Sequence, residues 1–135
     1  MAFTSQIILI RSDPAPKIPD DFPYRTKSLS EPFSGLIILV TDDYEPGIPD
    51  ESIRKIIGPV ELNGVDWMYI EYVTWAGRID AVRSFGECNG KEMTPYNDTV
   101  IETLEATYLK TMGDFGISKK DALDFPPFYR GFWDS

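Results

Sequence analysis

Five prolines stand within the 23 residues from Ser12 to Ser34, and they constrain the fold more than any other feature of the sequence. Proline fixes its own φ angle and has no amide proton, so this segment, SDPAPKIPDDFPYRTKSLSEPFS, cannot form a regular helix or a central strand. Long connections of this kind are uncommon in a compact domain. We therefore expect a Pro-rich loop over residues 12–34, with Phe22, Tyr24 and Phe33 packed onto the body of the protein.

Two apolar runs on either side of this loop predict strands in the interior of a sheet. Residues 6–11 read QIILIR and residues 35–41 read GLIILVT, so both have apolar centres of strand length. No apolar run approaches the ~20 residues that cross a bilayer, and the start MAFTSQ lacks the basic and apolar regions of a signal peptide. We expect a single α+β domain over residues 1–135 in the cytoplasm.

The strongest local signal is Asn63-Gly64, which stands between the β-prone runs VEL and VDW. Both central residues of a type I′ turn need positive φ angles, and an Asn-Gly pair supplies them readily. The strand after this turn runs to Trp75, and a second turn at AGR leads into IDAVRSFGE. The sequence therefore predicts a three-stranded antiparallel meander over residues 60–87.

Apolar periodicity predicts two helices. The segment DESIRKIIG has a stripe of isoleucines and ends at a glycine, which is typical of a short helix. A longer helix is expected over residues 98–112, where Thr99 and Glu102 have the spacing of a capping box. Its predicted apolar stripe, widened by Val100 and Leu109, consists of Ile101, Leu104, Tyr108 and Met112.

The aromatic tail over residues 124–135, DFPPFYRGFWDS, has to be covered by the protein's own core or by another molecule. Its rings are Phe125, Phe128, Tyr129, Phe132 and Trp133. The order of elements predicts an α+β fold with a mostly antiparallel sheet of about five strands. We expect the long helix on one face of this sheet and the tail or the Pro-rich loop on the other.

Strand alternation predicts which residues of the meander share a face, with a two-residue loop at either Ala76-Gly77 or Gly77-Arg78. Met68, Ile70 and Tyr72 are expected on a core face together with Arg83 and Phe85. The opposite face mixes rings with carboxylates and holds Trp67, Tyr69, Glu71, Val73, Trp75, Asp80, Val82 and Ser84. We expect the tail or the loop to cover this second face; the alternative is an open patch that binds a partner.

The net charge of −9 is concentrated in one part of the sequence. Between Ser28 and Gly77 there are nine acidic residues and two basic ones, Arg54 and Lys55. Such a charge repels nucleic-acid phosphates and anionic lipids and speeds association with a basic partner. The alternative is that the acidity serves solubility alone.

The residue types present exclude several kinds of catalysis. The sequence has no histidine and a single cysteine, Cys88, which removes the commonest general base, the catalytic triad and the usual ligands of zinc and haem. It also lacks a P-loop and a dinucleotide-binding glycine motif. We therefore expect no enzyme activity, no cofactor and no metal. Glu71 and Asp80, on one predicted face, are the alternative catalytic pair. The other interpretation is a surface ion pair, because Arg78 and Arg83 are nearby in sequence and Arg78 can share that face.

Three functions remain open. In size, acidity and absence of catalytic motifs the chain resembles the immunity proteins of bacterial toxin systems, which implies a protein that occludes a basic protein partner. A small-ligand binder with an aromatic-lined pocket between the meander and the Pro-rich loop is the first alternative, and a carboxylate-dependent hydrolase is the second. The predicted partner-binding residues are Asp42, Asp43, Glu45, Asp50, Glu51, Trp67, Tyr69, Glu71 and Trp75.

Overall fold

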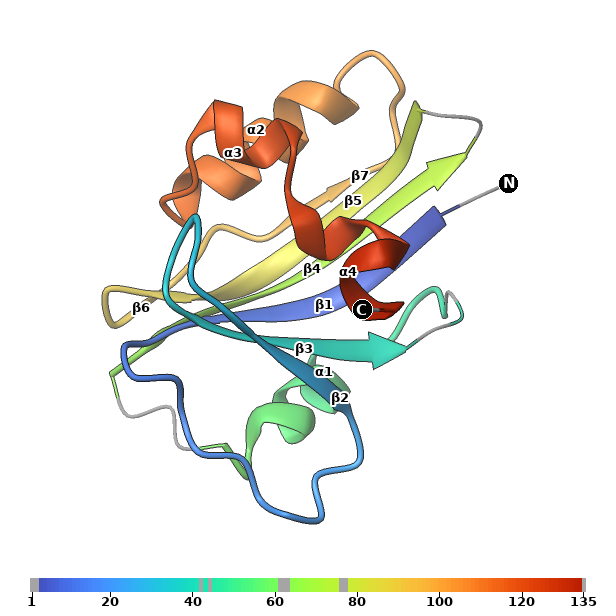
Figure 1. Cartoon of the computed structure of the whole chain (residues 1–135). Helices are drawn as coiled ribbons and strands as arrows, with labels where there is room; N and C mark the ends of the chain where they lie inside the picture. The colour runs from blue at the N-terminus through green and yellow to red at the C-terminus, as the bar shows by residue number, and fades with distance from the viewer. Residues whose placement is uncertain (1–2, 42, 44, 61–63, 76–77, 135) are drawn as a thin grey trace.

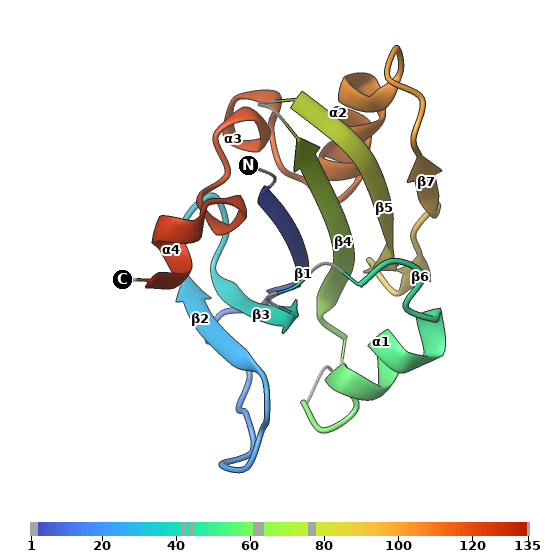
Figure 2. The same cartoon turned by 90° about the vertical axis from the view of Figure 1, so that its right-hand side faces the viewer.

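The computed structural model describes residues 3–41, 43, 45–60, 64–75 and 78–134. Within these residues, seven strands form one sheet in which every strand pair is antiparallel (Figure 1). Their spatial order is β2-β3-β1-β4-β5-β6, and β7 also pairs with β5 (Figure 2). The strands are β1 (Phe3–Arg11), β2 (Arg25–Leu29), β3 (Gly35–Thr41), β4 (Asp66–Trp75), β5 (Arg78–Cys88), β6 (Lys91–Glu92) and β7 (Tyr96–Asp98).

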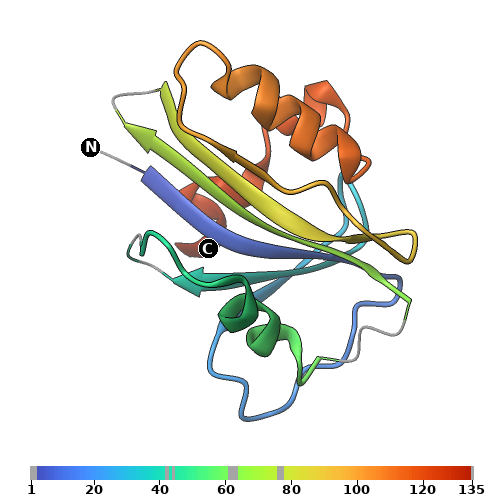
Figure 3. The same cartoon turned by 180° about the vertical axis from the view of Figure 1, so that it is seen from behind.

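Helices cover both faces of the sheet, as the nearly edge-on views in Figures 1 and 3 show. One face carries α2 (Leu104–Asp114), α3 (Lys119–Leu123), the 3₁₀ turn η1 (Pro126–Phe128) and α4 (Arg130–Asp134), and the other carries α1 (Asp50–Ile57). No helix among the described residues is long and apolar enough to cross a membrane.

Strand alternation divides the core into two clusters, one on each face. In β1, Ile7 and Leu9 point toward α2, whereas Ile8 and Ile10 point toward α1. All four side chains have no exposed surface, because β1 lies in the interior of the sheet between β3 and β4. The prediction of two internal strands around the Pro-rich segment is therefore confirmed for β1 and β3.

The α+β class and the antiparallel sheet are confirmed, but the expected number of about five strands is wrong. The structure adds short edge strands, and one of them, β2, lies inside the segment predicted as a loop. This strand fits between Pro23 and Pro32 and pairs only with β3 among the described strands. An edge strand is the kind of strand that neighbouring prolines permit.

The predicted meander is present in part. β4 and β5 form the expected hairpin, but the other edge of β4 pairs with β1 from Asp66 to Thr74. A strand before Asn63 would need the place that β1 occupies. Glu61, Leu62 and Asn63 themselves lie outside the described residues, and Gly64 has the positive φ of 72° that its predicted turn position requires.

The expected long helix is shorter, and it begins at Leu104 rather than near residue 98. The reason is Asp98 at the end of β7, whose carboxylate accepts hydrogen bonds from the Val100 amide and from the hydroxyls of Thr103 and Thr107. This local turn leaves Val100 and Ile101 exposed. The predicted stripe therefore holds from residue 104 onward, where Leu104, Tyr108 and Met112 are buried.

The aromatic tail packs into the protein's own core, on the same face as α2. Phe125, Phe128 and Trp133 are buried, and the ring of Phe128 stacks on Tyr72 with 4.5 Å between centroids. The side chains of Arg25 and Lys27 on β2 donate hydrogen bonds to the carbonyls of Trp133 and Phe132. The face with Trp67 and Tyr69 is covered instead by α1 and by part of the Pro-rich segment, including Ile18, Phe22 and Tyr24.

An ion pair at the far end of β1 contributes to stability in a pH-dependent way. The Arg11 guanidinium donates to Asp66 Oδ2 at 2.6 Å, and the Asn89 amide donates to Asp66 Oδ1 at 2.8 Å. Partial burial by itself raises the pKa of Asp66, but the bonds from Arg11 and Asn89 outweigh it and hold the pKa below its ordinary value of 3.8. The ionised form of this carboxyl is therefore stabilised by folding.

We expect Asp66→Asn to flatten the acid limb of the stability profile. Because the pKa of Asp66 is lower in the folded chain, its contribution is complete above about pH 5 and is lost as the pH falls through 3.8 and below. At neutral pH the substitution should cost about 0.5–1 kcal/mol, and the cost should disappear in acid. Urea titrations of both proteins from neutral pH to acid measure this; a cost that stays constant with pH would contradict it.

Candidate functional site

A β-bulge in β5 rearranges the two faces of the β4–β5 hairpin. Thr74 pairs with Ile79, but the next residue of β4, Val73, pairs with Ala81, so Asp80 is an extra residue on β5. One extra residue shifts the register by one and moves every later side chain to the opposite face. The predicted assignment of Arg83 and Phe85 to the face of Ile70 is therefore wrong.

The bulge places Arg83 directly opposite Glu71, under α1. The guanidinium Nη1 donates to Glu71 Oε1 at 2.9 Å, and the Tyr69 hydroxyl donates to the same oxygen at 2.7 Å. Only 4% of Glu71 is exposed, and Tyr69 is fully buried. Glu71 therefore belongs to a buried ion pair and faces Arg83, not Asp80, across the strands. The sequence offered a surface ion pair with a nearby arginine as the alternative to a catalytic pair. In the structure the arginine is Arg83, which was expected on the other face, and Glu71 is buried.

The same Arg83 also holds the chain that leads into α1. Its Nη2 donates to the Ile48 carbonyl and to Asp50 Oδ1, both at 2.7 Å. Buried Gln6 fixes the chain three residues earlier, because its amide group donates to the Glu45 carbonyl at 2.8 Å and accepts from the Glu45 amide at 3.0 Å. We call Gln6, Tyr69, Glu71 and Arg83 the buried network.

Contacts within the buried network keep Tyr69 and Arg83 protonated. Burial raises the pKa of Tyr69, and the neighbouring Glu71 carboxylate raises it further, so the hydroxyl stays protonated as a donor. Burial by itself lowers the pKa of Arg83, but its bonds to Asp50 and Glu71 raise the pKa above its ordinary value. Arg83 therefore stays charged. Tyr69 and Arg83 therefore act as hydrogen-bond donors and do not exchange protons near neutral pH.

The chain held by the buried network carries carboxylates to the surface. Asp43, Glu45, Asp50 and Glu51 are exposed, and we call these four residues the acidic surface. Asp50 pairs with Arg83 and still keeps 61% of its side chain exposed. Among the described residues, the other three form no ion pair. Asp42, also predicted here, lies outside the described residues.

A groove runs beside the acidic surface, between the Pro-rich segment and the start of α1. Its volume is about 290 Å³, and its lining comprises Tyr24, Val40, Glu45, Pro46, Gly47, Ile48, Pro49, Ser52 and Ile56. Glu45 thus belongs both to the acidic surface and to the wall of the groove. A second hollow shares Tyr24 and Val40 with it and also contains Arg25.

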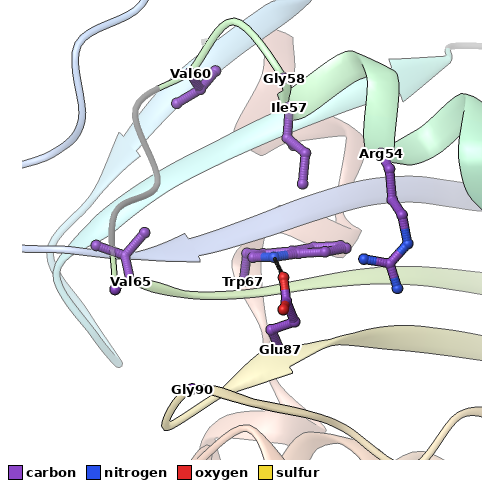
Figure 4. A pocket seen from close by; sticks show the side chains of 9 residues that line it. Arg54, Ile57, Gly58, Val60, Val65, Trp67, Glu87 and Gly90 are labelled. Carbon is purple, nitrogen blue, oxygen red and sulfur yellow. Dashed lines mark hydrogen bonds between the residues drawn. The ribbon is translucent and has the colours of Figure 1, made fainter.

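A further hollow of about 360 Å³ lies at the other end of α1 (Figure 4). Arg54 and Glu87 lie on either side of Trp67, whose indole Nε1 donates to Glu87 Oε2 at 2.9 Å. Only 2% of Trp67 is exposed, and the Arg54 guanidinium lies 5.3 Å from its ring centroid. The ring is therefore covered by the protein and not free to stack on a ligand.

Two of the aromatic residues predicted to contact a partner, Trp67 and Tyr69, do not reach the surface. Trp67 and Tyr69 are buried against α1, as is Glu71, so direct contact by these three does not fit the structure. The side chain of Trp75 lies outside the described part of the chain. Sequence reasoning missed the roles of Gln6 and Arg83, because both depend on strand pairings that no local pattern encodes.

The described residues contain no group of three or more carboxylate or thiol side chains placed to hold a metal ion. Comparison of the chain with protein-family models, with curated proteins and with solved structures found no match.

Proposed function

We propose that this protein binds a basic protein partner through the acidic surface and acts by occluding the partner's own site. The exposure of Asp43, Glu45 and Glu51 supports this, since these carboxylates have no cation among the described residues. Unneutralised charge of one sign attracts a partner of the opposite sign and raises the association rate. Immunity proteins of bacterial toxin systems, which the chain resembles in size and acidity, act by occlusion.

The observation that carries this proposal is the attachment of the acidic surface to the sheet. Gln6 holds both backbone groups of Glu45, and Arg83 holds the Ile48 carbonyl and Asp50. A surface that is ordered before binding loses less conformational entropy when the complex forms. A carboxylate cluster that served solubility alone would need no such buried support.

Capture from a native lysate tests the proposal. At low salt, the immobilised protein should retain basic proteins. These should be released at about 0.5 M salt, because the distance over which exposed charges interact then falls to a few ångströms. The variant Asp43→Asn/Glu51→Gln should retain at least about tenfold less of them, since each lost charge weakens a steered contact.

The matched control is Glu102→Gln/Glu105→Gln, which changes the net charge by the same amount. Glu105 lies on α2, across the sheet from α1, and Glu102 lies in the turn before α2; both are exposed. This variant should retain the same proteins as the unmodified chain. Equal loss of retention in both variants would show that net charge without a defined surface explains the capture. Equal retention by all three proteins would show that the carboxylates of Asp43 and Glu51 take no part in it. Either result would overturn the proposal.

A further inference from the structure

We infer that the groove beside Tyr24 takes an arginine side chain of the basic partner, an inference that rests on the proposed function. The lining of the groove combines apolar side chains with an acidic residue, Glu45. Arginine has the matching chemistry, because its three methylene groups are apolar and its planar guanidinium is always charged. The groove thus assigns a specific contact to a surface that otherwise attracts through net charge.

The apolar lining of the groove comes from separate parts of the chain. Ile56 of α1 belongs to the core cluster on this face, and Val40 near the end of β3 and Ile48 before α1 pack against the same cluster. Tyr24 adds a half-buried ring that lies 5.5 Å from the ring of Phe22, so neighbouring aromatic packing holds it in place. A guanidinium stacks favourably on such a ring, with about 0.5–1 kcal/mol at an exposed site.

Charge decides which ligand the groove accepts. Glu45 lines it, and the Gln6 amide fixes the backbone of Glu45 from inside the protein. Asp50, at the start of α1, adds a second exposed carboxylate next to the lining residue Pro49. Two of the protein's own cations lie nearby. Arg25 lines the adjoining hollow and donates to the Trp133 carbonyl. Arg83 is paired with Asp50 and Glu71, which leaves Glu45 as the unpaired carboxylate among the described lining residues. The groove is therefore complementary to a cation and repels an anion.

Arginine is a better fit than lysine because the groove offers a ring and a carboxylate together. A guanidinium can stack on the Tyr24 ring while its N–H groups donate to the Glu45 carboxylate, whereas an ammonium is a compact and strongly hydrated charge. This favours a partner that presents an exposed arginine on a convex or loop surface. The acidic surface around the groove then contacts the other basic residues of the partner.

Titration of the ¹⁵N-labelled protein with the peptide acetyl-Gly-Arg-Gly-amide tests this inference. We expect saturable shifts of the amide signals of Gly47 and Ser52, which line the groove. The peptide with citrulline in place of arginine keeps the shape and removes the charge, and it should bind at least about tenfold more weakly. Glu45→Gln should weaken the arginine peptide by a similar factor, since it removes a charge-assisted hydrogen bond.

Two Tyr24 variants separate the role of the ring from an effect on folding. Tyr24→Phe retains the ring and should bind as the unmodified chain does, and Tyr24→Ala should bind about two- to fivefold more weakly. Thermal melts identify any variant that fails to fold, in which case Glu45→Gln carries the test. Equal binding of both peptides, or shifts confined to residues outside the groove, overturns the inference. Neither result touches the proposed function, which the capture experiment decides without reference to the groove.

Discussion

Replacing Arg83 with leucine is expected to lower the free energy of unfolding by about 3–5 kcal/mol. Among the described residues, the substitution leaves the Glu71 carboxylate buried beneath α1 with the Tyr69 hydroxyl as its remaining hydrogen-bond partner. It also releases the Ile48 carbonyl and Asp50 from the sheet. An uncompensated buried charge is among the few causes of a loss this large. Urea denaturation followed by tryptophan fluorescence measures it.

The double variant Glu71→Leu/Arg83→Leu is the control for this prediction. It removes both charges, so the desolvation cost disappears and most of the lost stability should return. The acidic surface should still lose its anchor, so binding to a basic partner should remain weakened in both variants. A single Arg83→Leu variant with nearly full stability would contradict the buried ion pair.

Removing the ring of Phe125 from the aromatic tail should lower the free energy of unfolding by a similar amount. Phe125→Ala is expected to cost about 3–5 kcal/mol, as is usual for removing a buried phenyl ring. Only 1% of Phe125 is exposed, and its ring packs edge-on against Phe128 at 5.2 Å. The matched control is Tyr129→Ala, because 50% of Tyr129 is exposed.

The control should change the free energy of unfolding by no more than about 1 kcal/mol. Chemical denaturation of the two variants side by side separates the two roles of the tail. Similar, small losses for both would mean that the tail contributes little to the core and would reopen a role in binding.

Local patterns predicted the elements whose residues contact their own neighbours in sequence. The apolar runs of β1 and β3, the isoleucine stripe of α1 and the positions Leu104, Tyr108 and Met112 all lie where periodicity placed them. In each case the burial of one face depends on spacing along a single element. The prolines also excluded a central strand from the Pro-rich segment, and the strand that forms there, β2, lies at the edge of the sheet.

The features that local sequence patterns did not predict depend on contacts between residues that are distant in sequence. The extra residue at Asp80 moves Arg83 and Phe85 to the face of Tyr69, and nothing in the letters around it marks a bulge. The place beside β4 goes to β1, although Asn63-Gly64 predicts a strand adjacent in sequence. Asp98 delays the start of α2 through bonds to hydroxyls up to nine residues away.

The candidate site shows the same division. Charge counting located the acidic residues from Asp43 to Glu51, and these are exposed in the structure. It could not distinguish the exposed carboxylates from Glu71, which the fold buries with Arg83. The groove was not predicted, because Tyr24 and Glu45 come from separate segments and meet only through the packing of α1 and the Pro-rich segment.

The central claim is that a defined acidic surface recognises a basic partner, and the affinity for the purified captured protein tests it most directly. The dissociation constant should be measured at about 0.05 M and 0.5 M salt for the unmodified chain, Asp43→Asn/Glu51→Gln and Glu102→Gln/Glu105→Gln. The account predicts equal, salt-sensitive affinities for the first and third proteins and an affinity at least about tenfold weaker for the second at low salt. Equal affinities for all three, or binding that salt leaves unchanged, would contradict it.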